Sequence, residues 1–357
     1  MLTHLAGPFV IGIDAGGTKT RCVVLTLGGA LAGTGTGPGA NPNSGGDTAG
    51  ALGTALREAL GTLDRNHVLG GVFGIAGAGS AGRPAAVAAA RQAWQAAGLR
   101  GSPAVVTDIA VAFAAGTSAP KGIVVFSGTG AGAAVINDGA IVRRADGYGW
   151  LVGDEGSAVW LGQKAVRAAL AAYDGRGSPT VLTESVPRAL LPPGITAELE
   201  ASRCRHRQRR TFAMAGASPA ALRGGTAVLE HRLAEAQPDP RVAQAIVKEV
   251  YRLPVAALGR LGPVVAAAAT AGDQVARRIT AEAAEVLLRD VDAVRPALGG
   301  LLAPVVMHGS VLRDGPVADA VRAGLRDRFA ADPRSAGDGA VGAAGMALRR
   351  LGYPVPP

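Results

Sequence analysis

Cysteine and aromatic residues are scarce in this sequence, and each shortage excludes a class of protein. Two cysteines, Cys22 and Cys204, cannot form a zinc site of thiolates or the disulfide framework of a small secreted domain. We therefore expect a protein of the reducing cytoplasm. Aromatic residues make up 4% of a chain that is 48% hydrophobic, so its core must consist mainly of small aliphatic side chains.

Segments that direct a chain to a membrane are also missing. The N-terminal stretch MLTHLAGPFV has neither the basic region nor the long apolar region of a signal peptide. The alanine-rich run 254–272 contains Arg260 and two prolines, which makes it a poor membrane span. The sequence therefore predicts no membrane partner.

Motifs of several other protein classes are absent as well. The chain has no GxSxG or HExxH motif, and its five histidines show no metal-ligand spacing. The net charge of +9 suggests anionic ligands, but basic residues are dense only in segment 203–210. No aromatic residue lies among these arginines, so we expect a mobile surface loop there and no nucleic-acid partner.

The most informative stretch that is present is FVIGIDAGGTKT, residues 9–20. An apolar run ends at Asp14, a glycine turn follows, and a second strand-like run begins at Arg21. Gly16 and Gly17 would let backbone N–H groups approach a phosphate, and Asp14 is placed to hold Mg²⁺ through water. A plain hairpin is the alternative. A Walker loop is excluded, because Thr18 stands where its lysine must be and the turn returns into a strand.

The same pattern recurs about 110 residues later, a period too long for a solenoid. Residues 122–135, GIVVFSGTGAGAAV, again give a buried strand, a glycine turn and a strand. Asn137-Asp138-Gly139 then predicts a hairpin into a third strand at 140–143, as Gly28-Gly29 does in the first half. With 357 residues, we expect two similar α/β domains that face each other.

The remaining elements follow from hydrophobic periodicity. Helices are predicted at 48–63, 84–97, 157–173, 255–295, 317–329 and 341–351. Buried strands are predicted at 70–75, 104–106 and 303–307. Segment 185–245 is rich in proline and basic residues and is expected to be irregular.

Three glycines after one of these strands imitate a dinucleotide-binding motif. Gly77, Gly79 and Gly82 have the GxGxxG spacing between a strand and a helix. That fingerprint also needs an acid about 20 residues later to hold the ribose, and no Asp or Glu lies between Asp64 and Asp108. We therefore do not expect a Rossmann site.

Polar residues at the ends of predicted strands mark the expected site. Asp108 follows the strand at 104–106, at the end where ligands bind in α/β sheets, and 127–130 offers a second phosphate turn. Asp154 lies before a predicted helix and could grip sugar hydroxyls. Each acid also has a structural alternative, because Asp108 could cap helix 109–115 and Asp154 could cap helix 157–173.

Several motifs, in order, resemble a known family: GIDAGGTKT, GANPN, GIAGAG, VVTDIAVAFAAG, FSGTGAGA, DGYGWLVGDEGSAVWLGQKAV and HGSV. They are similar to the N-acetylglucosamine kinase branch of the BadF/BadG/BcrA/BcrD family, within the actin-like, sugar kinase and Hsp70 ATPase superfamily. The resemblance implies an α/β fold of two ribonuclease H-like (actin-like ATPase) domains with an interdomain cleft. These domains would be 1–118 and 119–357, with 185–245 as an insert and a final helix able to pack back on the N-terminal domain.

The resemblance also implies roles for individual residues. Asp108 would be the catalytic base, with Asp14 holding Mg²⁺ through water. ATP and its phosphates would be bound by Gly16, Gly17, Thr18, Lys19, Thr129, Gly130, Gly309 and Ser310. The sugar would be bound by Asn41, Gly77, Asp108, Gly147, Tyr148, Gly149 and Asp154. Ala76 departs from mammalian members of the branch, which carry a serine near the sugar at that position.

The function implied is phosphoryl transfer from ATP, with Mg²⁺, to an amino sugar by a homodimeric kinase. N-acetylglucosamine, made into its 6-phosphate, or glucosamine would be the substrate. Two alternatives stay open. One is an ATPase activator of a radical dehydratase or reductase, which needs cysteines for an iron–sulfur cluster. The other is a non-catalytic sugar sensor on a kinase fold.

Overall fold

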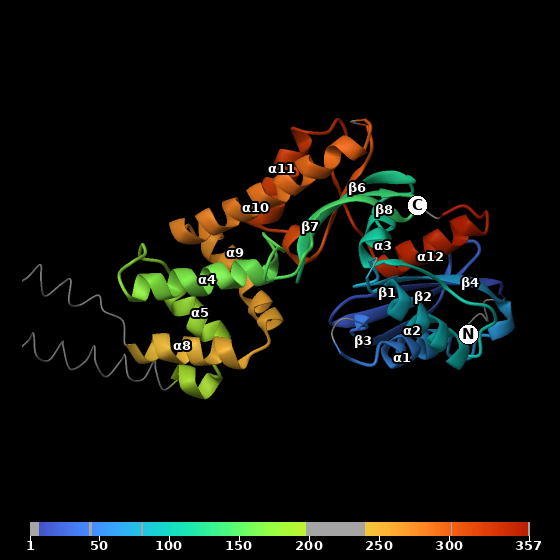
Figure 1. The fold of residues 1–357 in the computed structure, drawn as a ribbon, viewed down its shortest axis with the longest axis horizontal. Coiled ribbons are helices and arrows are strands. Elements are labelled where there is room, and N and C mark those ends of the chain that lie inside the picture. The colour runs from blue at the N-terminus through green and yellow to red at the C-terminus, as the bar shows by residue number, and fades with distance from the viewer. Residues whose placement is uncertain (1–6, 43–44, 80, 198–239, 301, 356–357) are drawn as a thin grey trace, which may run out of the picture.

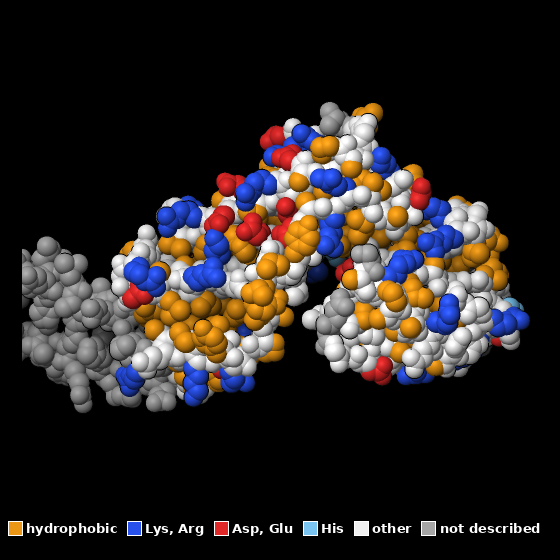
Figure 2. Space-filling view, in the orientation of Figure 1, with side chains coloured by type: hydrophobic (Ala, Val, Ile, Leu, Met, Phe, Trp, Pro, Cys, Tyr) orange, Lys and Arg blue, Asp and Glu red, His pale blue; other side chains and the backbone are white. Residues whose placement is uncertain are grey.

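The computed structural model of the protein describes residues 7–42, 45–79, 81–197, 240–300 and 302–355. Within these ranges the chain forms two five-stranded sheets, each with its own helices (Figure 1). The space-filling view shows an open notch between the lobe that contains β1 to β5 and the helical lobe that contains α4 to α10 (Figure 2).

The first sheet has the strand order β3-β2-β1-β4-β5. β1 (Phe9–Ala15), β2 (Lys19–Thr26) and β3 (Leu31–Pro38) form an antiparallel meander. β4 (Val68–Ile75) runs parallel to β1, and β5 (Ala104–Thr107) runs parallel to β4. The unbroken apolar run of β1 follows from this position, because a central strand covered on both faces meets no water.

Helices α1 (Thr48–Leu60) and α2 (Arg83–Ala96) cover the outer face of this sheet (Figure 1). A row of glycines in β3 brings α1 unusually close. A Cβ added at Gly33, Gly35 or Gly37 would lie 2.0, 2.1 or 2.5 Å from a carbonyl oxygen of α1. The glycines therefore let the helix rest directly on the strand. A short 3-10 turn, η2 (Arg65–His67), leads into β4.

The second sheet repeats the first, strand for strand. Its order is β10-β9-β6-β7-β8, and its strands are β6 (Lys121–Ser127), β7 (Ala131–Asn137), β8 (Ala140–Asp146), β9 (Val305–His308) and β10 (Arg334–Ser335). β6, β7 and β8 form the meander, while β9 and β10 run parallel to β6. The internal repeat predicted from the two glycine turns is therefore confirmed.

Most of the remaining helices make the larger lobe, in which α10 packs on β6, β7 and β8 of the second sheet (Figure 1). They are α4 (Ala158–Tyr173), α5 (Leu182–Leu190), α8 (Pro240–Arg252), α9 (Gly262–Thr270), α10 (Gln274–Val294) and α11 (Pro316–Arg326). Three 3-10 turns join them: η3 (Val255–Leu261), η4 (Arg295–Ala297) and η5 (Ser310–Leu312). One apolar core, built largely of Ala, Val and Leu, links these helices to β6, β7 and β9.

The expectation that 185–245 is irregular is wrong at both ends of that segment. α5 continues to Leu190 with Pro187 inside it, and α8 begins at Pro240. Proline at the first helical position is well tolerated, since its missing N–H would have no partner there. The residues between 198 and 239, including the basic cluster 203–210 and Cys204, lie outside the described ranges.

Two helices lie between the sheets and join them. α3 (Asp108–Ala114) and α12 (Gly339–Arg350) share a core with Val10 of the first sheet and Val124 of the second. Gly12 allows the contact, because a Cβ there would lie 2.1 Å from the Ala340 carbonyl oxygen. The final helix thus packs on β1, and a domain boundary near residue 118 stays a prediction.

Among the described residues, no helix on its own has the length and apolar character to cross a bilayer. The segments Val255–Thr270 and Gln274–Ala297 meet these criteria only when joined, and the pair bends by 117°.

Candidate active site

The turn between β1 and β2 presents free backbone to solvent. The Gly16 N–H donates to the Lys19 carbonyl at 2.9 Å, which closes the turn. Gly17, Thr18 and Lys19 are exposed, and a Cβ added at Gly17 would meet no atom within 4 Å. The predicted first phosphate turn therefore has open space beside Gly17 for a ligand, while Gly39 lies against its other side.

Two predicted sugar-binding residues adjoin this turn. The Ala40 N–H donates to the Gly16 carbonyl at 3.0 Å, which sets Asn41 next to it. The Ala76 N–H donates to the Ala15 carbonyl at 2.8 Å, and Gly77 follows with φ at 78°, a conformation that glycine adopts without strain. The structure thus brings Asn41 and Gly77 to the end of β1 where Asp14 lies.

Three carboxylates gather at this end of the first sheet. Asp14 lies one residue before the end of β1, Asp108 begins α3 and Asp338 precedes α12. Burial, followed by the charges of Asp108 and Asp338, raises the pKa of the Asp14 carboxyl to about 7. A pKa displaced this far marks a functional position more often than an ordinary surface acid.

The environment of Asp108 leaves its carboxylate available. Thr107 caps α3, since its hydroxyl oxygen accepts from the Ala110 N–H at 3.3 Å, so Asp108 is not needed as the cap. The Asp108 Oδ1 accepts from the Ile109 N–H at 3.0 Å. Burial raises the pKa of this carboxyl, and no Lys or Arg of the described ranges forms an ion pair with it. An unpaired carboxylate of raised pKa is a suitable general base.

Sequence reasoning missed Asp338. Its side chain caps α12 by accepting from the Ala340 N–H at 3.0 Å, and it forms an ion pair with Arg21 of β2. A signal was available, because Gly337-Asp338-Gly339 directly precedes a periodic apolar run. The ion pair was not predictable, since Arg21 lies at the other end of the chain.

The turn between β6 and β7 is braced by protein on several sides. The Ser127 hydroxyl donates to the Gly156 carbonyl at 2.8 Å, and the Ala158 N–H donates to the Gly128 carbonyl at 2.8 Å. Gly309, with φ at 102°, lies so close that a Cβ would stand 2.2 Å from the Ser127 carbonyl oxygen. Gly309 and Ser310 therefore adjoin the predicted second phosphate turn, in which Thr129 is exposed.

Asp154 points at this second turn. Its side chain is 9% exposed and its φ is 57°, and its Oδ1 accepts from the Ala131 N–H at 3.3 Å. Both carboxylate oxygens lie 3.2 Å from the Cβ position of Gly130. Burial raises the pKa of this carboxyl. The alternative role as a helix cap is wrong, because Ser157 caps α4 by accepting from the Trp160 N–H at 3.1 Å.

The loop 147–156 carries the other predicted sugar-binding residues and is organised by Asp146, which sequence reasoning missed. Asp146 Oδ1 accepts from the Asp154 N–H at 2.8 Å, and its Oδ2 accepts from the Glu155 N–H at 2.9 Å. Only the Asp-Gly dipeptide at 146–147 hinted at a turn.

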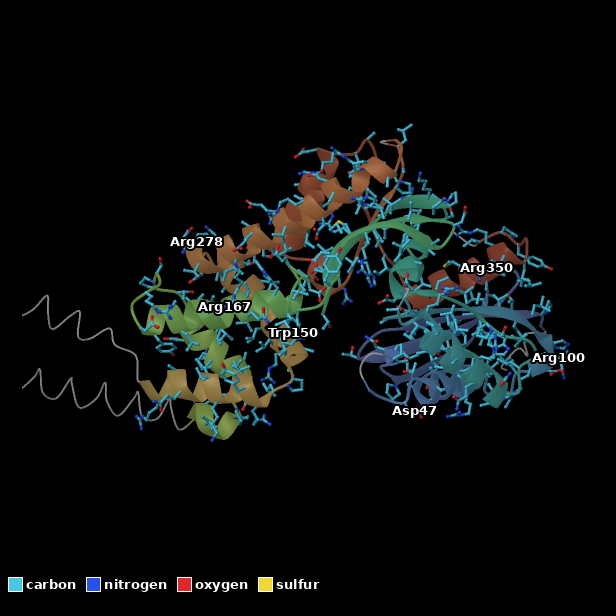
Figure 3. All side chains as sticks on the ribbon, viewed as in Figure 1. Asp47, Arg100, Trp150, Arg167, Arg278 and Arg350 are labelled. Carbon is cyan, nitrogen blue, oxygen red and sulfur yellow. The ribbon has the colours of Figure 1, made fainter. Side chains whose placement is uncertain are left out.

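The tip of this loop is apolar and exposed. Tyr148 is 65% exposed, with the Arg144 guanidinium 5.4 Å from the centroid of its ring. Gly147 and Gly149 flank it with φ at 77° and 96°. Trp150 lies on the side of the helical lobe that faces the β1–β5 lobe (Figure 3).

No group of three or more His, Cys, Asp or Glu side chains within the described ranges forms a ready-made metal centre. The residues at Asp14 nevertheless fit a divalent cation. Their mutual repulsion, visible in the raised pKa of Asp14, would be relieved by a positive ion. Mg²⁺ in particular is commonly held by one or two carboxylates together with water and substrate phosphates.

Comparisons with known proteins give a family and a fold. The sequence model of the BadF/BadG/BcrA/BcrD ATPase family matches residues 11–347. A curated relative, the N-acetylmuramic acid/N-acetylglucosamine kinase of Clostridium acetobutylicum, is 34% identical over 184 residues. That match spans 49% of this chain and 57% of the relative.

Two solved structures have a similar fold. A candidate N-acetylglucosamine kinase of Chromobacterium violaceum has a TM-score of 0.61 at 23% identity, with 95% of this chain and 99% of that chain covered. Its counterpart from Porphyromonas gingivalis has a TM-score of 0.62 at 17% identity, with 96% and 99% covered. At such identities the likeness establishes fold alone, and it confirms the expected α/β architecture of two actin-like domains.

Proposed function

We propose that this chain, which belongs to the BadF/BadG/BcrA/BcrD ATPase family, is an ATP-dependent kinase that phosphorylates an amino sugar. The observation that carries the proposal is the position of Asp108. It is a partly buried, unpaired carboxylate beside Asp14, on the same lobe as an open glycine turn. Phosphoryl transfer requires such a base, a cation site and a phosphate-binding turn.

ATP is proposed to lie between the two glycine turns. The first turn, 14–20, offers open space beside Gly17, together with Thr18 and Lys19. The second turn offers Thr129 and Gly130, and Gly309 and Ser310 would adjoin the adenosine. When bound, Mg²⁺ would neutralise charge on the phosphates, and Asp14 would hold it through water. The family description as an ATPase supports ATP as the nucleotide.

Asp108 is proposed to accept the proton of the attacking sugar hydroxyl. Its raised pKa brings it closer to neutral pH, where a carboxylate is a more effective base. The Ile109 N–H holds one oxygen, which fixes the orientation of the carboxylate and leaves the other oxygen for the substrate. The sugar would otherwise be held by Asn41, Gly77, Gly147, Tyr148, Gly149 and Asp154.

The substrate proposed is N-acetylglucosamine, phosphorylated to its 6-phosphate, or else free glucosamine. The kinase from Clostridium acetobutylicum, which acts on N-acetylmuramic acid and N-acetylglucosamine, supports an N-acetylated hexosamine. A cytoplasmic homodimer is proposed with it. A monomer mass by light scattering at micromolar protein, with ligands present, would defeat the dimer.

Two observations bear on the alternatives. An iron–sulfur ATPase activator needs accessible thiolates, but the Cys22 side chain is fully buried and burial raises the pKa of its thiol well above the usual range. A non-catalytic sugar sensor would not need the unpaired Asp108 beside the Asp14 site. Both observations favour the kinase.

The proposal is tested by measuring ADP release with a panel of sugars that includes N-acetylglucosamine, N-acetylmuramic acid, glucosamine and glucose. We expect sugar-dependent ADP release with an N-acetylated hexosamine, and a sugar phosphate as the product. Sugar binding without ATP consumption would identify a sensor instead. A protein that absorbs in the iron–sulfur bands and hydrolyses ATP without sugar would identify an activator.

A further inference from the structure

Asp290, on α10, is a half-buried acid that the proposed mechanism does not use. Among the described residues, its Oδ2 is the one buried side-chain oxygen or nitrogen without a hydrogen-bond partner. Leaving a carboxylate oxygen in this state is costly, because the group loses water and gains nothing in return. Such an exception in a folded protein calls for a functional or structural reason.

The charged groups around Asp290 come from the 147–156 loop, from the strand end before it, and from α10 itself. Burial raises the pKa of Asp290 to about 7, and the negative charges of Asp146, at the end of β8, and of Glu155 add to the effect. Arg289, the neighbour on α10, opposes it and lies 4.0 Å from Glu155. Asp290 therefore changes charge near neutral pH, in the field of Asp146, whose carboxylate holds the loop.

The loop rests directly on the same helix. Gly156, with φ at 80°, lies so close to α10 that a Cβ would stand 2.9 Å from the Ala283 carbonyl oxygen. At the other end of the loop, Asp146 accepts hydrogen bonds from the N–H groups of Asp154 and Glu155. Anything that displaces the Asp146 carboxylate would therefore displace Asp154, whose side chain faces the second phosphate turn.

We propose that Asp290 is a positioning residue for sugar binding, which acts on the 147–156 loop through Asp146. This proposal rests on the proposed function. When Asp290 is neutral, Asp146 and Glu155 keep their places and the loop is held in its sugar-binding form. When Asp290 is ionised, its half-buried negative charge repels both acids, loosens the two hydrogen bonds to Asp146 and weakens sugar binding.

The first test follows the loop itself and needs no substrate. Trp150 lies in the loop, so its fluorescence, isolated as the difference between the protein and its Trp150→Phe variant, reports the loop conformation. We expect this difference signal to change with a midpoint near pH 7 in the unmodified protein. In Asp290→Asn the change should disappear, with the low-pH signal kept throughout, because Asn remains neutral.

The second test separates binding from chemistry. With N-acetylglucosamine at saturating Mg-ATP, we expect the KM for the sugar to rise about fivefold between pH 6 and pH 8.5, a factor typical of coupled sites. In Asp290→Asn this KM should stay at its low-pH value. The pH profile of kcat should be the same in both proteins, since Asp290 touches neither substrate nor the reacting atoms.

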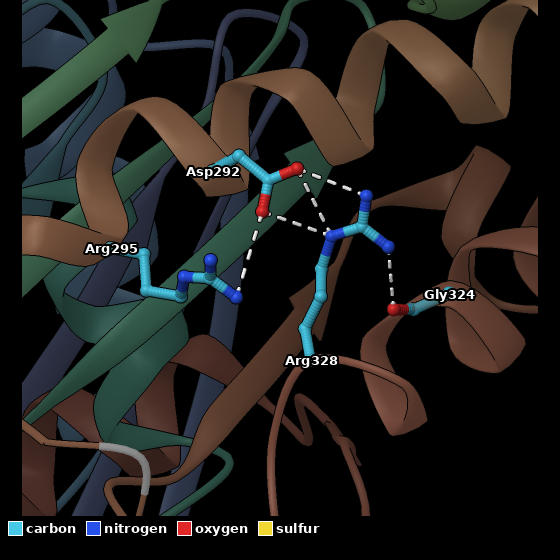
Figure 4. Close-up of polar contacts among 4 residues, drawn as sticks. All are labelled: Asp292, Arg295, Gly324 and Arg328. Atoms are coloured by element: carbon cyan, nitrogen blue, oxygen red, sulfur yellow. Dashed lines mark hydrogen bonds and ion pairs between the residues drawn. The ribbon is translucent and has the colours of Figure 1, made fainter.

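A matched control is available two residues along the helix. Asp292, also on α10, accepts from Arg328 Nη2 at 2.9 Å, and its Oδ1 lies 3.8 Å from Arg295 Nη1 (Figure 4). Asp292→Asn removes the same charge from the same helix and should keep the pH changes of Trp150 fluorescence and of KM. If Asp290→Asn does not fold, Asp290→Ser replaces it.

Each outcome decides the proposal. Unchanged pH profiles in Asp290→Asn, or their equal loss in Asp292→Asn, would overturn it. If the unmodified protein phosphorylates no sugar, the proposed function fails. The Trp150 signal then still decides whether Asp290 controls the loop.

Discussion

The two sheets have the same topology and carry the same kind of glycine turn after the corresponding strand. The protein around the two turns differs. The turn after β1 is held on one side by Gly39 and Ala40, but a Cβ at Gly17 would meet no protein atom within 4 Å. The turn after β6 is held by Gly156, by the start of α4 and by Gly309. The difference indicates that the first turn keeps more open space for a ligand beside Gly17, whereas the protein encloses the second turn on more sides.

A second pair of equivalent positions carries the same acid but differs in ion pairing. Asp108 follows β5 and begins α3, and Asp338 follows β10 and caps α12. The repeat makes them counterparts, since β5 and β10 occupy the same edge of the two sheets. Asp338 is paired with Arg21, while no ion pair is formed by Asp108 within the described ranges. One carboxylate is thus committed to structure and the other is available for chemistry.

Asp108→Asn should have the largest effect of any substitution. Asn keeps the shape and the contact with Ile109 but cannot accept the proton, so kcat should fall by about 10²–10⁴-fold. Stability should not fall, because Thr107 supplies the cap and Asn removes a carboxylate whose charge is disfavoured by burial. Steady-state kinetics and a melting curve measure both. A kcat near that of the unmodified protein would remove Asp108 from the mechanism.

Gly309→Val should damage the fold of the braced turn. The residue has φ at 102°, and its Cβ would stand 2.2 Å from the Ser127 carbonyl oxygen, so we expect a loss of about 3 kcal/mol or more in unfolding free energy. Gly300→Val is the control, since a Cβ there meets nothing within 4 Å. Equal stability of the two variants in urea would show that the second turn is not braced as described.

Asp14 should make the stability of the lobe that contains β1 to β5 depend on pH. Its pKa of about 7 in the folded protein exceeds the ordinary 3.8, so stability is lost as pH rises between these values. Asp14→Asn should therefore melt higher than the unmodified protein at pH 8 and equally at pH 4. Its affinity for Mg-ATP should fall by about 10–100-fold. A variant that melts lower at pH 8 would contradict the assigned environment.

Gly17→Val tests the open turn directly. The side chain would project into space that no protein atom fills, so the melting temperature should stay within a degree or two of the unmodified protein. ATP affinity should fall by about tenfold, because the side chain would crowd the phosphates. Calorimetric titration with ATP measures this. Unchanged affinity in the folded variant would argue that the phosphates lie elsewhere.

Local patterns predicted the repeated half-sheets well. The glycine turns at 14–20 and 127–132 set the strand boundaries, and the apolar runs beside them became central strands. Segment 185–245 was less predictable, because proline usually interrupts a helix. Here Pro187 lies within α5 and Pro240 begins α8. Asp146 and Asp338 were missed because their roles depend on partners that only the folded chain supplies.

The smallest effect belongs to the counterpart of Asp108. Asp338→Asn keeps the cap on α12, since Asn also accepts from the Ala340 N–H, but it loses the ion pair with Arg21. The two side chains are 27% and 46% exposed, so water screens the pair and the loss should be about 0.5–1 kcal/mol. Removing this charge also takes away one cause of the raised pKa of Asp14. The pH below which Mg-ATP binding is lost should therefore be lower than in the unmodified protein. The kcat at pH 8 should stay within about threefold of the unmodified protein. A fall in kcat as large as that of Asp108→Asn, in a variant that melts normally, would mean that both carboxylates serve the chemistry and that the ion pair does not set them apart.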